Sequence, residues 1–305
     1  MPGAPTPKSA SYWKKARLVG YLFIAPNVVL FFLLTVFPVL FSFLLAFFHW
    51  GGKRLEFSDF RWAGLSNFAE LLGATEFWYY LYNTLFLMLA IPVTILINLF
   101  VAMLMSNKLR EITLYRGIWF LPSVAGGVAT LLLWKWIFEP TGGLFNTLLG
   151  YLGIQGPEWL QDPSWAKPAF IIMGWWGSAG GFGMLLYLAA LQNIPPELYE
   201  AAAIDGAGWW ARFRHVTWPM VSPTTFFLLI TGIIGGFQAG FMNAYVMTRG
   251  GPAGATTTLS YYIYGQAYEN FRMGYASAVA WTVFLFVAAF TVLNWKLSER
   301  LVHYE

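Results

Sequence analysis

The sequence contains very little charge. Charged residues make up 10% of its 305 positions and hydrophobic residues 58%, with a mean hydropathy of +0.57. Typical soluble domains are about 25% charged. So few charged groups cannot cover a water-facing surface, and the composition therefore predicts an integral membrane protein. Cysteine is also absent, which excludes disulfides and thiolate metal ligands and leaves the redox state of the compartment undetermined.

The long apolar runs contain no aspartate or glutamate. A carrier coupled to protons or sodium usually keeps an ionisable group inside the membrane as its coupling site. The phosphate-binding motif G-x-x-x-x-G-K-[ST] is missing too, because Gly52-Lys53 is followed by Arg54. Neither H-E-x-x-H nor G-x-S-x-G occurs. These absences disfavour an ion-coupled secondary carrier and a membrane-embedded enzyme, and uphill transport would need energy from another chain.

Six uncharged runs are each long enough to cross a bilayer, which takes roughly 18–20 residues. They are Leu18–Gly52, Phe77–Asn107, Gly117–Trp134, Pro168–Pro196, Val216–Thr248 and Met273–Trp295. A membrane β-barrel would instead show alternating segments of about 10 residues. The runs predict an all-α polytopic membrane protein with six transmembrane helices. Residues 1–17 would form an N-terminal tail and residues 18–305 one transmembrane domain.

The distribution of lysine and arginine predicts the orientation. The side that holds both termini and the loops around residues 107–116 and 193–220 carries eleven of them, and the opposite side carries seven. Since positive residues gather on the cytoplasmic side, both termini and the 193–220 loop are predicted to be cytoplasmic.

The loop between the fourth and fifth runs contains N-I-P-P-E-L-Y-E-A-A-A-I-D-G-A-G-W-W. Pro195-Pro196 can end one helix and start the next, because proline fits the first helical turn. Acidic residues follow near the positive end of that helix, and Gly206 permits a sharp turn. We expect two short helices at the membrane surface, joined at Gly206, with the second beginning at Trp209.

The spacing in this loop resembles a known signature. Glu200-Ala201-Ala202 is followed after three residues by Gly206, and after nine more by Val216-Thr217-Trp218-Pro219. This resembles the "EAA" signature of the permeases of binding-protein-dependent ABC importers, with Trp218 where leucine is usual. Tyr245–Pro252 (Y-V-M-T-R-G-G-P) is similar to the carbohydrate branch, which includes maltose-transporter-like permeases. Many relatives have an aspartate before Tyr245, and this chain does not.

The resemblance implies a permease subunit in a bacterial or archaeal inner membrane, without enzymatic activity or a cofactor of its own. Its implied partners are a second permease subunit, two ATPase subunits that bind ATP and Mg²⁺, and an extracytoplasmic sugar-binding protein. The implied substrate is a di- or oligosaccharide or related glycoside, with a monosaccharide or glycerol phosphodiester as the alternative. The loop would be the coupling helix that enters the ATPase, through Glu200, Ala201, Ala202, Asp205 and Gly206.

Aromatic and small polar residues in the fourth and fifth runs are candidates for the substrate path. Sugars bind to aromatic faces and to polar groups that match their hydroxyls, and the resemblance places the sugar contacts on these two spans. The candidates are Trp175, Ser178, Phe182, Phe237, Gln238 and Asn243. The alternative is that the glycine-rich stretch 177–183 packs helices together. On the opposite side of the membrane from the coupling loop, Arg249–Pro252 is predicted to be a flexible turn.

Overall fold

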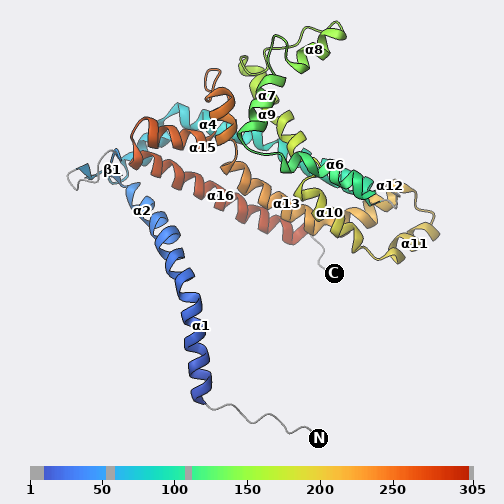
Figure 1. The fold of residues 1–305 in the computed structure, drawn as a ribbon, viewed down its shortest axis with the longest axis horizontal. Helices are drawn as coiled ribbons and strands as arrows, with labels where there is room; N and C mark the ends of the chain where they lie inside the picture. The colour runs from blue at the N-terminus through green and yellow to red at the C-terminus, as the bar shows by residue number, and fades with distance from the viewer. Residues whose placement is uncertain (1–9, 53–58, 107–111, 302–305) are drawn as a thin grey trace.

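The computed structural model describes residues 10–52, 59–106 and 112–301, which are mostly helical (Figure 1). Four helical stretches are long and apolar enough to cross a membrane: Arg17–Leu45, Thr75–Met105, Trp209–Thr248 and Met273–Lys296. Two further pairs qualify only if each is one bent span. Ile112–Val124 and Val128–Ile137 meet at 95°, and Pro163–Ser178 and Phe182–Gln192 at 47°. The described residues give six spans only if each bent pair is one span, so the count of six stays a prediction.

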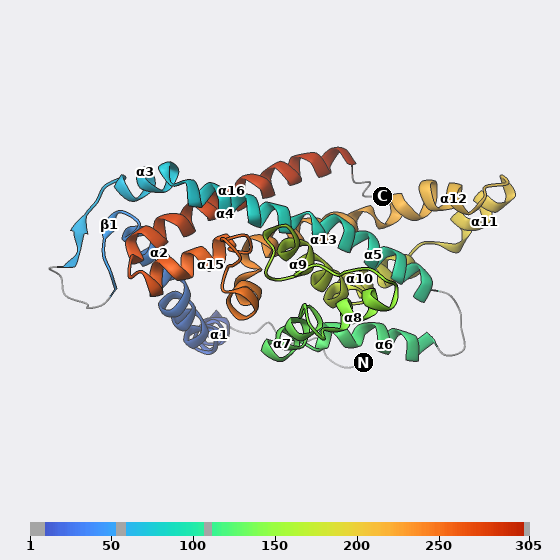
Figure 2. The ribbon, with the colours of Figure 1, turned by 90° about the horizontal axis from the view of Figure 1, so that it is seen from above.

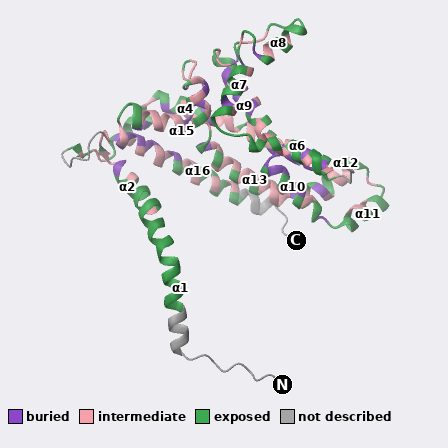
Figure 3. Cartoon of the chain, in the orientation of Figure 1, coloured by how far each residue is buried: buried purple, intermediate pink, exposed green. Residues whose placement is uncertain are grey.

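The first long helix stands away from the rest of the chain. It comprises α1 (Ala10–Phe31), a π-helical turn η1 (Phe32–Val36) and α2 (Phe37–Leu45). Figure 1 shows α1 projecting from the bundle, and Figure 3 shows that its described surface is almost entirely exposed. Most of its large exposed side chains are leucine, valine, isoleucine and phenylalanine. Lipid or another protein must cover them, because they are too apolar to face water.

The remaining long helices form an elongated bundle. They are α4 (Thr75–Met88), α5 (Ala90–Met105), α9 (Pro163–Ser178), α10 (Phe182–Gln192), α13 (Trp218–Gln238) and α16 (Met273–Leu301). One buried cluster lies where α5, α10 and α13 meet, around Leu99, Met184 and Val221. A second lies between α4, α13 and α16, around Phe77, Phe237 and Val279. The bundle is thus held by apolar packing along α13.

Shorter elements occupy the two ends of the bundle (Figure 2). At one end lie a small antiparallel hairpin, β1 (Phe48–His49) with β2 (Arg61–Trp62), and α3 (Ser66–Gly73). At the other lie α11 (Pro196–Ile204) and α12 (Trp209–Arg212), which continues through η3 (Phe213–Thr217) into α13. The other short elements are α6 (Ile112–Val124), α7 (Val128–Ile137), α8 (Leu144–Tyr151), α14 (Phe241–Asn243), η4 (Ala244–Thr248), α15 (Leu259–Tyr264) and η5 (Gly265–Glu269).

Buried Asn83 ties three segments together near the hairpin end. Its side-chain amide donates to the carbonyls of Gly254 (2.9 Å) and Thr257 (3.2 Å), and its Oδ1 accepts from Lys167 Nζ at 2.9 Å. The Lys167 ammonium also lies 4.8 Å from the centroid of the Tyr82 ring, which stabilises its charge. One asparagine therefore joins α4, α9 and the loop before α15.

That loop is held in place, in contrast to the flexible turn predicted at Arg249–Pro252. Thr256 Oγ1 donates to the carbonyl of Gly251 at 2.7 Å, and Thr257 Oγ1 donates to that of Gly250 at 3.1 Å. Residues 255–259 are all buried. Glycine and proline indicated a turn, but Thr256 and Thr257, which follow it, donate their hydroxyl hydrogens to its backbone carbonyls.

Replacing Asn83 by leucine should destabilise the chain by about 1–3 kcal/mol, because two buried carbonyls and Lys167 lose their partner. The measurement is thermal unfolding of the purified chain in detergent, followed by tryptophan fluorescence. Glu70→Gln is the control. It breaks the exposed pair with Arg272, which should contribute less than about 1 kcal/mol. Equal shifts for the two variants would contradict a structural role for Asn83.

Candidate functional site

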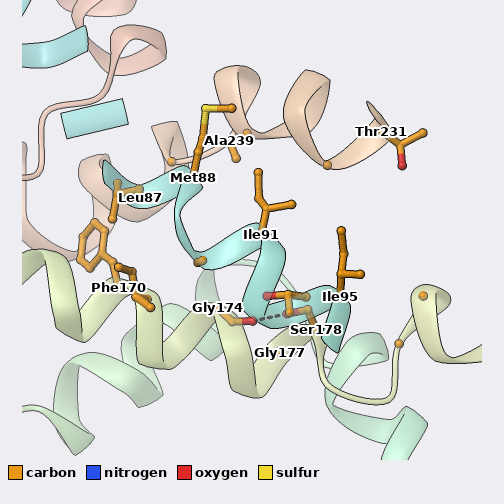
Figure 4. A pocket seen from close by; sticks show the side chains of 18 of the residues that line it. Leu87, Met88, Ile91, Ile95, Phe170, Gly174, Gly177, Ser178, Thr231 and Ala239 are labelled. Carbon is orange, nitrogen blue, oxygen red and sulfur yellow. Dashed lines mark hydrogen bonds between the residues drawn. The ribbon is translucent and has the colours of Figure 1, made fainter. Parts of the chain in front are cut away.

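A cavity of about 590 Å³ opens between α4, α5, α9 and α13 (Figure 4). Its apolar wall includes Leu87, Met88, Ile91, Ile95 and Phe170, which Figure 4 shows on α4, α5 and α9. Glycines at 174, 177, 181, 183, 232, 236 and 240 leave the space open. Several of these positions also let helices approach closely: a Cβ at Gly232 would lie 2.8 Å from Ile91 Cγ2. These glycines therefore both allow close helix packing and leave space for the cavity.

The polar groups of the cavity wall are hydroxyls and amides. They belong to Thr84, Thr94, Asn98, Ser123, Ser178, Thr231, Asn243 and Thr258. Among the described residues that line the cavity, none has a charged side chain. The wall can therefore hydrogen-bond a neutral polar solute, and it offers no counter-charge to an ion.

The wall hydroxyls are oriented by their own helices. Ser178 Oγ donates to the carbonyl of Gly174 at 2.5 Å, drawn as the dashed line in Figure 4. Thr231 Oγ1 donates to the carbonyl of Phe227 at 2.8 Å, and Ser123 Oγ to that of Phe120 at 2.7 Å. A hydroxyl that donates its hydrogen to a backbone carbonyl can still accept hydrogen bonds through the lone pairs of its oxygen. These three side chains therefore suit a solute that donates hydrogen bonds.

Asn98 supports a break in the helical wall. Between α9 and α10 the chain turns at Gly180, whose φ is +79°, and its backbone N–H is left outside a helix. Asn98 Oδ1 accepts from that N–H at 3.2 Å. A Cβ at Gly183 would lie 2.8 Å from Asn98 Nδ2. The asparagine and glycine together fix the bend beside the cavity.

Three of the six substrate-path candidates line this cavity: Ser178, Phe182 and Asn243. Trp175 lies on the neighbouring face of α9, where its indole donates to the carbonyl of Ala90 at 3.3 Å and fixes α9 to α5. Its assignment as a sugar contact stays a prediction.

The last two candidates are neighbours in α13 that point in different directions. Phe237 is buried among Leu71, Phe77 and Leu259 in the core between α13 and α16. Gln238 is exposed and does not line the cavity. Successive residues on a helix are about 100° apart, so two adjacent side chains rarely share one site.

Sequence patterns did not select several of the lining residues. Thr231, Thr258 and Asn98 line the cavity but are not among the six candidates, although Asn98 is a polar residue in an apolar run. A polar side chain in an apolar run needs a hydrogen-bond partner or a cavity, so this feature of the sequence could have indicated Asn98 as a lining residue. Threonine gives a weaker signal, because its hydroxyl can bond to its own helix.

A second candidate site is the α11–α12 loop at the far end of the bundle (Figure 2). Gly206 ends α11 with φ +75°, a conformation that glycine adopts without strain. The N–H of Ala207 donates to the carbonyl of Ala202 at 2.9 Å and that of Gly206 to Ala203 at 3.1 Å, the hydrogen bonds of a helix C-cap. The turn expected at Gly206 is present, and the second helix continues directly into α13.

Side-chain contacts make the two helices of this loop one rigid unit. Arg212 Nε donates to the carbonyl of Ala207 at 2.7 Å. The hydroxyls of Tyr199 and Thr217 lie 2.9 Å apart and join α11 to η3. Movement of α11 would therefore be transmitted to the base of α13.

The outer face of the loop is open. Glu200, Ala201, Asp205 and Gly206 are exposed, and Ala202 is half-buried. Ile204 is 86% exposed, and Trp209 and Trp210 are also exposed. Trp209 stacks on Phe213 with ring centroids 5.8 Å apart. The loop thus presents both carboxylates and large apolar side chains.

Residues 16–302 match the family described as the binding-protein-dependent transport system inner membrane component, and the chain belongs to this family. It is 39% identical over 92% of its length to the lactose transport system permease protein LacF of Rhizobium radiobacter, covering 94% of that protein. It is 36% identical over 99% of its length to the probable ABC transporter permease protein YesP of Bacillus subtilis, covering 97% of it. The chain is accordingly a multi-pass membrane permease subunit.

Its fold is similar to that of a solved transporter chain. A chain in the crystal structure of a bacterial ABC transporter involved in the import of the acidic polysaccharide alginate superposes with a TM-score of 0.83. The match covers 96% of this chain and 100% of that chain at 24% identity. At this identity the likeness supports the helical permease fold.

The absence of cysteine allows a direct test of the cavity. Ser178→Cys and Thr231→Cys should react with a water-soluble methanethiosulfonate reagent, because both positions line the open cavity. Phe237→Cys, in the adjoining core, should react at least about tenfold more slowly. Labelling rates of purified single-cysteine variants, measured by mass spectrometry, make the comparison. Equal rates at Ser178 and Phe237 would refute this placement.

Proposed function

We propose that the chain is the permease subunit of an ATP-driven ABC importer and that it conducts a neutral di- or oligosaccharide. The observation that carries the substrate class is the uncharged cavity, whose wall hydroxyls can accept hydrogen bonds from sugar hydroxyls. Similarity to the lactose permease and to the trehalose/maltose permease MalF of Thermococcus litoralis (32% identical) supports this class.

A glycerol phosphodiester is the second candidate substrate. The chain is 34% identical over 79% of its length to the sn-glycerol-3-phosphate transport system permease protein UgpA of Pectobacterium atrosepticum, and sn-glycerol-3-phosphate is likewise a phosphate ester of glycerol. A phosphodiester carries a negative charge, and burying an unpaired charge is costly. The described lining of the cavity contains no lysine or arginine to pair with it. The neutral sugar is therefore preferred.

The energy would come from two ATPase subunits that bind ATP and Mg²⁺ at the cytoplasmic face. The α11–α12 loop would be the coupling element, with Glu200, Ala201, Ala202, Asp205 and Gly206 at the contact. Its internal hydrogen bonds support this role, because a rigid loop transmits a partner's movement to α13. The exposed Ile204, Trp209 and Trp210 would add apolar contact to the ATPase.

A second permease subunit would complete the path, since this chain does not fully enclose the cavity and α1 leaves the bundle with exposed apolar faces. An extracytoplasmic binding protein would deliver the sugar to the end of the bundle opposite the coupling loop. In this arrangement both termini lie in the cytoplasm.

Reconstituted uptake tests the proposed substrate. The complete transporter in proteoliposomes, supplied with its binding protein and internal ATP, should accumulate at least one of lactose, trehalose, maltose or maltotriose, and should not accumulate glycerophosphocholine. Thr231→Val, which removes a wall hydroxyl, should reduce sugar uptake about three- to tenfold. Thr291→Val on α16 is the control, as its hydroxyl also bonds its own helix but lies outside the cavity. Uptake of glycerophosphocholine alone would overturn the sugar assignment.

Gly206→Trp should lower sugar uptake to below about a tenth of the wild-type rate, since it strains the turn and places a bulky group on the coupling surface. The sugar affinity of the binding protein should not change. Gly153→Trp, just after α8, is the matched control, because Gly153 also has a positive φ (+74°) and open space around it but belongs to a different surface. Normal ATP-dependent uptake by the Gly206 variant would eliminate the coupling role.

A further inference from the structure

Five aromatic rings gather on the segments α14, η4, α15 and η5. Of these segments, α15 is labelled at the end of the bundle away from the α11–α12 loop (Figures 1 and 2). This outer aromatic cluster consists of Phe241, Tyr245, Tyr261, Tyr264 and Tyr268. Phe241 stacks on Tyr245 with centroids 5.7 Å apart, and Tyr264 lies edge-on to Phe241 at 5.0 Å. The contacts join α14 and η4 to α15 and η5.

The spacing of the five residues explains why their rings meet. Phe241 and Tyr245 are four residues apart on one helical segment, and Tyr261, Tyr264 and Tyr268 are three and four apart on another. Residues at these spacings share one helix face. Two aromatic stripes therefore face each other.

Much of this cluster remains accessible. Tyr268 is 60% exposed and Tyr245 is 43% exposed, while the other three rings are half-buried. The loop before α15 packs closely against the ring of Tyr261, since a Cβ added at Gly250 would lie 2.9 Å from this ring. The rings are thus fixed in position and still present open surface.

The cluster is continuous with the cavity. Ala239 and Gly240, just before Phe241, line the cavity, and so does Thr258, the N-cap residue of α15. Ser260 Oγ donates to the carbonyl of Ala239 at 3.1 Å and joins the two segments at this point. The cluster and part of the cavity lining therefore lie on the same pair of segments.

Polar groups border the rings. Burial, and then the nearby Glu269 carboxylate, raises the pKa of the Tyr261 hydroxyl, and Arg249 lowers it, so both charged side chains lie close to this ring. Both are exposed. Charged residues are depleted at the centres of protein interfaces and are costly in lipid. A ring surface with a charged, hydroxyl-rich border instead matches a pyranose, which has apolar C–H faces and a rim of hydroxyls.

We propose that the outer aromatic cluster is a saccharide-stacking subsite, which receives a pyranose ring of the released oligosaccharide before that ring enters the cavity. The C–H face of the sugar lies on the electron-rich ring face of the exposed Tyr245, and its hydroxyls bond to the polar border. This inference rests on the proposed carbohydrate importer. The subsite retains the sugar when the binding protein opens, and so raises the number of sugars imported per ATP hydrolysed.

The test compares Tyr245→Leu with Tyr245→Phe in the complete transporter. Leucine keeps an apolar side chain but removes the ring, whereas phenylalanine removes only the hydroxyl. The probe is whichever of lactose, trehalose, maltose and maltotriose the wild type imports fastest. Tyr245→Leu should lower the sugar imported per ATP about three- to tenfold, and Tyr245→Phe should stay within about twofold of wild type. Tyr151→Leu, at an 83% exposed tyrosine on α8, should have no effect.

Two further measurements separate stacking from other roles. Stimulation of the ATPase by the sugar-loaded binding protein should survive in Tyr245→Leu, and its loss would show that the cluster binds that protein. The second permease should co-purify with the variant, and its loss would show a subunit interface. Either result overturns the subsite, as does an unchanged ratio of sugar to ATP in Tyr245→Leu. If the wild type imports none of the four sugars, the proposed function itself fails, and the subsite fails with it.

Discussion

Each break in an apolar helix must find hydrogen-bond partners for its backbone, because hydrocarbon supplies none. In this protein two such breaks lie beside the cavity. The chain bends between α9 and α10 at Gly180, whose N–H is satisfied by Asn98, and breaks again at Ala239–Gly240, where Ser260 bonds to the free carbonyl of Ala239. Irregular backbone at these points is possible because it faces protein and an open cavity. Polar side chains at the cavity therefore have a second role, because they satisfy the helix breaks that give the cavity its shape.

The two ends of the bundle use hydrogen bonds for different purposes. At the α11–α12 end, Tyr199 and Arg212 make a surface loop rigid while its carboxylates and tryptophans remain exposed. At the opposite end, Asn83 and Lys167 hold the loop before α15 against α4, and this loop supports Tyr261 from behind. The proposed coupling element and the proposed saccharide subsite thus lie at opposite ends of the same long helices.

Predictions from the sequence were most accurate for segments whose residue types favour one structure. Long uncharged runs predict apolar helices. The spacing of Glu200, Gly206 and Pro219 likewise predicted the helix, turn and helix of the exposed loop. They were weaker for the cavity. Ser178, Phe182 and Asn243 line it, whereas Phe237 belongs to the core, and the threonines of the wall were not anticipated. The turn at Arg249–Pro252 was expected to be flexible, and buried threonines hold it instead.

The sequence by itself determined the membrane class, the helical fold, the family and the position of the exposed loop, because hydrophobicity and motif spacing are properties of consecutive residues. Tertiary structure decided the rest. α13 is apolar on all sides, so its pattern gives no indication of which face meets α16 and which meets the cavity. Packing against α5 and α16 sets that rotation, and with it whether an aromatic residue becomes core, cavity wall or outer surface. The outer aromatic cluster arises in the same way, because only folding brings Tyr245 beside Tyr264.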